Sequence, residues 1–215
     1  MQDLVNVTAI VLSAAPAGEY DKRVVLLTKE RGKITAFAKG ARRQTSKLMA
    51  ATNLFAFGEF TLYPGRNAYT MTDAKIQNYF EELRLDFEGA YYGMFFLEMC
   101  DYYCRENNDE KELLKLLYQS LKALSVKSLN RKLVQCIFEM KAMVVNGEFP
   151  GIPKEGIWQE STEYAVLYIM NASIEKLYTF TVSDSVLAEM IQFSEKYRSC
   201  YIDRELKSLE MLSVL

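Results

Sequence analysis

The sequence contains no histidine, and this absence removes several kinds of catalytic site. Histidine is the base of most serine and cysteine hydrolase sites and a ligand in the HExxH zinc helix. Its side chain is also the one that ordinarily titrates nearest neutral pH. The Walker phosphate-binding loop and the GxGxxG and GxSxG motifs are missing as well. We therefore expect no enzyme activity and no catalytic residues; a metal-dependent nuclease stays an alternative because carboxylates are plentiful after residue 80.

Cysteine is scarce, and no two cysteines form a CxxC pair. The four are Cys100, Cys104, Cys136 and Cys200. Because they are scattered and no secretory signal precedes them, we expect reduced thiols buried as small apolar side chains. Cys100 and Cys104 lie one helical turn apart and could share a metal, but no further ligand cluster accompanies them. The sequence predicts no cofactor and no metal.

No apolar run is long enough to cross a bilayer; residues 91–100 and 164–174 are the most apolar stretches. The N-terminus also lacks a cationic start followed by an apolar segment. Half of the 215 residues are hydrophobic, which allows a sizeable core in one large domain or two smaller ones. We expect a soluble cytoplasmic protein with no membrane partner.

The charge is unevenly divided along the chain, although the net charge is only −2. Residues 1–80 hold 11 basic and 6 acidic side chains, whereas residues 81–215 hold 15 basic and 22 acidic ones. A basic module is therefore concealed in a mildly acidic protein, and such asymmetry indicates that one half binds a polyanion.

The basic character is concentrated in residues 22–47, which carry nine basic side chains and one acidic one. The middle of this stretch alternates as a strand does, with Ile34, Ala36 and Ala38 on one face. The other face presents Lys33, Thr35, Phe37 and Lys39, two cations flanking an aromatic ring. This face suits a phosphate chain with stackable bases. A solvated strand with salt-bridged lysines is the alternative. The candidate DNA-binding residues are Lys22, Arg23, Lys33, Phe37, Lys39, Arg42, Arg43 and Lys47.

Five strands are predicted in the first 80 residues, with a turn over residues 14–20. The predicted strands are residues 4–12, 24–28, 33–39, 55–63 and 68–76, and residues 42–51 are left as a loop or a short helix. Five short strands joined by hairpin turns fit a small closed barrel such as the OB-fold, in which strands two and three bind oligonucleotides. The predicted fold class is α+β, with this barrel followed by an all-α domain.

After residue 79 the apolar period lengthens to that of helices. We expect a helix over residues 87–107, a second whose N-cap is Asn108 or Asp109, and a third that begins after Asn130 and ends at Gly147. Residues 164–169 could be strand or helix. Asp184 is expected to cap a fourth helix, and a last helix should cover residues 201–212.

Three cations stand together within the otherwise acidic second half. They are Lys127, Arg131 and Lys132. One interpretation is that they are ordinary cations at a helix end, favoured by the helix dipole. The other is that they form a docking site for an acidic peptide.

Several segments resemble the RecO family, the bacterial recombination mediators that anneal DNA. The resemblance lies in Ala9-Ile10-Val11-Leu12, Gly18-Glu19-Tyr20-Asp21 and the segment LLTKERGKITAFAKGARR of residues 26–43. Phe57-Gly58-Glu59-Phe60 and Arg204-Glu205-Leu206-Lys207-Ser208 extend it. It covers most of the chain, is most specific over residues 39–43 and is weak over residues 150–180.

This resemblance implies an N-terminal OB-fold with a helical C-terminal domain. It implies binding of single- and double-stranded DNA, annealing of complementary strands, and loading of RecA recombinase onto strands coated by single-stranded DNA-binding protein, together with RecR. It places the protein in the cytoplasm at the nucleoid. An adaptor whose helical domain binds the acidic tail of single-stranded DNA-binding protein is the alternative function.

The predicted domains are residues 1–78 and 79–215. Many members of the family carry a four-cysteine zinc element, which here would fall at about residues 147–170. No cysteine lies between Cys136 and Cys200, so we expect a degenerate, zinc-less insertion held by packing around Trp158 and Tyr164.

Overall fold

The structure is a computed structural model, and it describes residues 3–154 and 156–212. Residues 1–2 of the first predicted domain, residues 213–215 of the second, and residue 155 of the predicted insertion lie outside the described residues. The chain forms two compact units. The first contains the chain up to Arg84 together with Leu97–Leu114, and the second contains Leu85–Phe96 and the chain from Lys115 onward. The predicted boundary after residue 78 stays a prediction.

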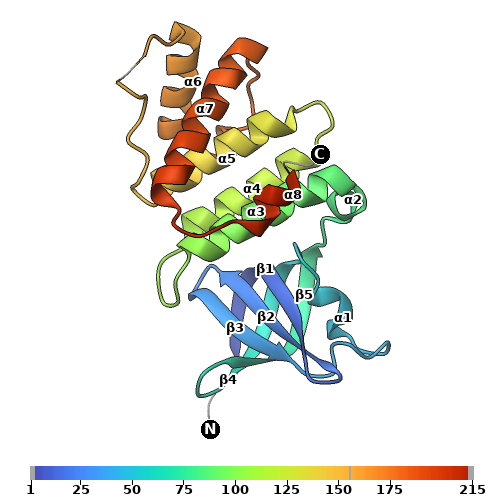
Figure 1. Ribbon diagram of the computed structural model, residues 1–215. Coiled ribbons are helices and arrows are strands. Elements are labelled where there is room, and N and C mark those ends of the chain that lie inside the picture. The colour runs from blue at the N-terminus through green and yellow to red at the C-terminus, as the bar shows by residue number, and fades with distance from the viewer. Residues whose placement is uncertain (1–2, 155, 213–215) are drawn as a thin grey trace. The chain divides into compact units, whose positions relative to one another are not determined.

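Residues 5–78 form a closed five-stranded barrel with the strand order β1-β2-β3-β5-β4 (Figure 1, blue to cyan). The strands are β1 (Val5–Ala17), β2 (Asp21–Thr28), β3 (Gly32–Ala38), β4 (Phe57–Pro64) and β5 (Tyr69–Asn78). All pairs are antiparallel except β3 with β5, and β1 with β4 closes the barrel. The short helix α1 (Leu48–Ala51) precedes β4. This barrel confirms the predicted OB-fold.

The alternation of apolar residues builds the barrel core. Ile34, Ala36 and Ala38 of β3 are buried as predicted, together with Val24 and Leu26 of β2. The turn predicted for residues 14–20 is wrong in part, because β1 continues through Pro16 to Ala17. Proline is tolerated near the end of a strand, where one ladder hydrogen bond can be lost.

Helices follow the barrel (Figure 1, green to red). They are α2 (Glu81–Leu85), α3 (Phe87–Tyr103), α4 (Lys111–Leu124), α5 (Arg131–Val145), α6 (Glu160–Asn171), α7 (Asp184–Tyr201) and α8 (Lys207–Leu212), with a 3₁₀ turn at Ile174–Lys176. Within the second unit α5, α6 and α7 pack against one another. No helix in the described ranges has the length and apolar character that a bilayer crossing requires.

Three predicted helix limits need correction. The helix expected over residues 87–107 ends at Tyr103, and the segment left open at residues 164–169 belongs to α6. Ser183, rather than Asp184, caps α7, since its hydroxyl accepts a hydrogen bond from the backbone N–H of Val186. The last helix begins at Lys207 rather than at residue 201, because α7 itself runs to Tyr201 and residues 202–206 are not helical. Asn130 caps α5 as predicted and accepts from two backbone N–H groups.

Candidate nucleic-acid interface

The outward face of β3 is polar and basic, as the alternation predicts, and Arg23 of β2 adds a further cation beside it. Lys33 and Thr35 are partly exposed, and Phe37 is 37% exposed. Arg23 lies directly opposite Phe37 in the antiparallel register. Its guanidinium donates to the Thr35 hydroxyl at 3.5 Å. Two cations and one ring therefore share a face whose other side is the barrel core.

A groove of about 760 Å³ lies on this face, and we call it the outer-face groove. Its floor is formed by strand residues, namely Ser13, Arg23, Val25, Lys33 and Thr35. One wall is the turn between β4 and β5, residues 64–69, which was predicted from its Pro-Gly-Arg-Asn sequence. The other wall is formed by Asp101, Arg105, Glu106 and Asn107.

The second wall is held in place by backbone hydrogen bonds to the turn between β2 and β3. The N–H of Lys33 donates to the carbonyl of Arg105, and the N–H of Asn107 donates to the carbonyl of Arg31, each at 3.0 Å. Gly32 makes this approach possible. Its φ of +63° is in the left-handed region, and a Cβ there would collide with the Arg105 carbonyl.

Cations outnumber carboxylates in the outer-face groove. Arg23, Lys33, Arg66 and Arg105 line it with Asp101 and Glu106. The Lys33 ammonium donates to the Asp101 carbonyl at 2.5 Å and to its carboxylate at 3.2 Å. The Arg105 guanidinium instead donates to the carbonyls of Tyr102 and Cys104, and among the described residues no carboxylate forms an ion pair with it. The groove is therefore cationic, although Asp101 partly neutralises the charge of Lys33.

A second group of predicted cations lies at the end of the barrel and supports the local fold. Arg42 donates to the carbonyls of Gly18 and Glu19 at 3.0 and 2.9 Å. The Arg43 guanidinium lies 4.6 Å from the centre of the Tyr20 ring. These contacts clasp the turn between β1 and β2.

Lys22 belongs to the same group, because its ammonium lies near the charge of Arg42. It follows Asp21 at the start of β2, and its side chain points to the face opposite that of Arg23. Its ammonium donates to the Thr52 hydroxyl at 3.1 Å. Partial burial lowers the pKa of Lys22, and the nearby charges of Arg42 and Arg84 lower it further. Lys22, Arg42 and Arg84 therefore repel one another at this end of the barrel. A bound phosphate would reduce that repulsion.

The structure thus separates six of the eight predicted residues into two groups. Arg23, Lys33 and Phe37 lie on the outward face with the groove, whereas Lys22, Arg42 and Arg43 lie at the barrel end. Lys39 and Lys47 are exposed. Within the described ranges Lys33 is the only one of these seven cations with a carboxylate partner. Arg66 and Arg105 were missed as groove residues because turn and helix-end positions carry no periodic signal.

The three cations of the second half line a hollow of about 480 Å³ together with Glu88, Tyr92, Leu129 and Asn130. Lys127 and Lys132 are exposed, whereas Arg131 forms ion pairs with Asp86 and, at 2.5 Å, with Glu88. The helix-end interpretation is wrong in its electrostatics. Arg131 and Lys132 occupy the first turn of α5, where the dipole disfavours cations.

The cysteines differ from the prediction at one position. Cys100, Cys104 and Cys136 are buried, but Cys200 is exposed. Burial raises the pKa of each of the three buried thiols. Cys100 and Cys104 therefore stay protonated, which is unfavourable for metal ligation. In the described ranges no three Cys, Asp or Glu side chains gather as a metal site.

The segment expected to replace the zinc element is held by two sets of contacts, one around Trp158 and one around Lys141 of α5. The Trp158 ring meets Phe193 edge-on at 4.5 Å, and its N–H donates to the Pro153 carbonyl. The largely buried Lys141 ammonium donates to the carbonyls of Ile169, Met170 and Ala172 at the end of α6. Tyr164 was expected to take part, but it is 73% exposed. A buried cation thus satisfies the carbonyls at this helix end.

Comparison with known proteins agrees with the barrel and the helices. The family model described as "Recombination protein O N terminal" matches residues 1–80, and "Recombination protein O C terminal" matches residues 84–152. The chain is 26% identical to the DNA repair protein RecO of Clostridium perfringens, over 99% of this chain and 98% of that protein. It is also 26% identical to the RecO of Acetivibrio thermocellus, over 97% and 96% of the two chains. With the RecO of Alkaliphilus metalliredigens it shares 32% identity over 68% of this chain and 60% of that protein. The chain therefore belongs to the RecO family.

Proposed function

We propose that this chain is a recombination mediator in DNA repair that binds single- and double-stranded DNA without sequence specificity and anneals complementary strands. The observation that carries the proposal is the outer-face groove, which is lined by four cations and two carboxylates and whose floor includes β2 and β3, the strands that OB-folds use for oligonucleotides. The relatives are named DNA repair proteins, and family membership supports the same role.

The groove chemistry accounts for binding that ignores base sequence. Arg23, Lys33, Arg66 and Arg105 neutralise phosphates, which carry no base code. Phe37 offers an exposed ring on the outward face of β3 for stacking, at roughly 1–3 kcal/mol per base, and the partly buried Tyr69 lines the groove. The cations Lys22, Arg42, Arg43, Lys39 and Lys47 extend the positive surface along the barrel.

Annealing follows from this mode of binding. Two strands held through their phosphates repel each other less, because lysine and arginine charges replace the condensed counterions. The base edges stay free to pair, since the protein reads none of them. No covalent step is needed, so the chain acts as a mediator rather than as an enzyme and requires no cofactor.

We further propose that the protein acts with RecR and helps to load RecA onto strands coated by single-stranded DNA-binding protein. These partners follow from family membership and from the DNA-binding role. They place the protein in the cytoplasm, at the nucleoid.

The test is a titration of labelled single-stranded oligonucleotides of two unrelated sequences at several salt concentrations. We expect equal affinities for the two sequences and a steep loss of affinity with salt. The Arg23→Ala/Arg66→Ala double variant should bind more weakly and anneal more slowly. Lys75→Ala is the matched control, because Lys75 is an exposed cation of β5 that does not line the groove. A flat salt response, or a double variant that behaves as the control does, would refute the proposal.

A second function is favoured by the hollow at the start of α5. Lys127 and Lys132 are exposed beside the apolar surfaces of Tyr92 and Leu129, an arrangement that suits the acidic tail of single-stranded DNA-binding protein. Lys132→Ala should weaken capture of a peptide with that tail sequence and leave thermal stability unchanged. Arg131→Ala is less informative, because it leaves Asp86 and Glu88 without their cation. Unchanged capture by Lys132→Ala and Lys127→Ala would remove this assignment.

A further inference from the structure

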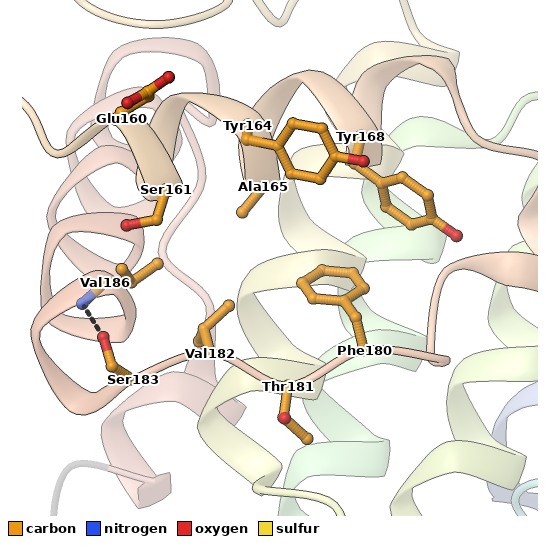
Figure 2. Close-up of a pocket in the computed structure, with 10 residues that line it drawn as sticks. All are labelled: Glu160, Ser161, Tyr164, Ala165, Tyr168, Phe180, Thr181, Val182, Ser183 and Val186. Carbon is orange, nitrogen blue, oxygen red and sulfur yellow. Dashed lines mark hydrogen bonds between the residues drawn. The ribbon is translucent and has the colours of Figure 1, made fainter.

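An open groove of about 790 Å³ lies in the second unit between α6 and the extended segment before α7 (Figure 2). This size is within the range of sites that take small ligands or peptide side chains. Figure 2 shows the rings of Tyr164 and Phe180 on opposite sides of the open space, with Val182 next to Phe180 and Val186 farther along, near Ser183. The DNA-binding proposal and the hollow at α5 make no use of this groove, which we call the α6 groove.

One wall of the α6 groove is a stripe along a helix. Glu160, Tyr164 and Tyr168 are spaced four residues apart on α6, so they lie on one side of the helix. Tyr164 is 73% exposed, and Glu160 is exposed at the first position of the helix. A carboxylate and an open aromatic face therefore occupy successive turns on one side of α6.

The remaining aromatic residues of the groove are fixed. The ring of Phe180 meets Tyr168 edge-on with the ring centres 5.2 Å apart, and the Tyr168 hydroxyl donates to the carbonyl of Lys176 at 3.0 Å. Val186 is buried on α7, and the Ser183 hydroxyl caps that helix. The far side and floor of the groove are thus formed before any ligand arrives, which lowers the entropic cost of binding.

The charge around the α6 groove is negative. Residues 156–190 contain five carboxylates and a single cation, Lys176, and Lys115 of α4 forms an ion pair with one of the carboxylates, Glu175. Glu160, Glu163 and Asp184 are exposed on α6 and at the start of α7. A nucleic acid or an acidic peptide would be repelled here, whereas a cationic segment would be attracted.

We propose that the α6 groove binds a basic, arginine-containing peptide segment of a protein partner. The guanidinium of the partner lies over the Tyr164 ring and pairs with the Glu160 carboxylate, a geometry that suits arginine better than lysine. A neighbouring aliphatic side chain of the partner enters between Phe180 and Val186. The groove supplies both the charge and the apolar contact that such a segment needs.

The test uses the full chain and a fluorescent octapeptide of four Arg-Leu repeats, followed by anisotropy. We expect this peptide to bind more tightly than its Lys-Leu counterpart. A Glu-Leu counterpart should show no binding. Tyr164→Ala and Glu160→Gln should each weaken binding by roughly three- to tenfold, the effect of losing one cation–π contact or one charge-assisted pair.

Two matched controls separate groove binding from general attraction to an acidic surface. Glu163→Gln removes the same charge from α6, and Leu167→Ala removes an exposed apolar side chain from it, but neither residue lines the groove. Both should bind as the unaltered chain does, within about twofold. Equal effects of Glu160→Gln and Glu163→Gln would overturn the proposal. So would a lack of peptide binding together with a dimer that Tyr164→Ala dissociates, since a second copy would then be the occupant.

Discussion

Replacement of Asp101 by asparagine is expected to strengthen DNA binding, because Asp101 competes with phosphate for Lys33. The Asp101 carboxylate lies 3.2 Å from the Lys33 ammonium, and the two side chains are 32% and 25% exposed. Partly exposed ion pairs of this kind contribute about 0.2–1 kcal/mol. Removal of the Asp101 charge should raise the affinity for single-stranded DNA by up to about fivefold at low salt. Lys33 then becomes available for one more phosphate, which should steepen the salt slope by about 0.7.

The assay is an anisotropy titration of a labelled oligonucleotide at four or five salt concentrations. Glu112→Gln is the matched control, because Glu112 is an exposed carboxylate of α4 outside the outer-face groove. The double variant Lys33→Ala/Asp101→Asn completes a mutant cycle and should lose the gain. The reasoning is refuted if Asp101→Asn binds no more tightly than Glu112→Gln, or if its gain survives the removal of Lys33.

Three further predictions concern stability and accessibility. Gly32→Ala should destabilise the fold by about 1–3 kcal/mol in thermal or urea unfolding, since it strains a left-handed residue and displaces Arg105; a variant as stable as the original would contradict this. Lys141→Met should cost about 1–3 kcal/mol in the same assay, because three carbonyls lose their donor, while DNA affinity stays unchanged. Iodoacetamide should modify Cys200 in the folded protein well before the other three thiols, and mass spectrometry that finds several equally fast sites would disagree.

The barrel could be predicted from the sequence because its signals are local. Ile34, Ala36 and Ala38 alternate with polar residues, and this pattern defines both the strand and its buried face. The start of α5 was also predictable, since Asn130 has a short side chain that reaches the first free N–H groups. The end of β1 was not, because Pro16 usually marks a turn and only the pairing with β2 keeps it in the strand.

The candidate site could be predicted only in part. Arg23, Lys33 and Phe37 follow from strand periodicity, whereas Arg105 and Asp101 reach the groove through the hydrogen bonds between Lys33 and Arg105. Such pairing between segments about 70 residues apart leaves no trace in local composition. Charge density alone also could not separate Arg42, which clasps a turn, from cations that face the groove.

The most direct test of the DNA-binding account is photochemical cross-linking of the full chain to a single-stranded oligonucleotide that contains 4-thiothymidine, with the cross-linked peptides identified by mass spectrometry. We predict cross-links in the peptides that contain Phe37, which is exposed on the outward face of β3, and Tyr69, which lines the outer-face groove. Cross-links confined to residues 115–212, with none in the barrel, would contradict the account.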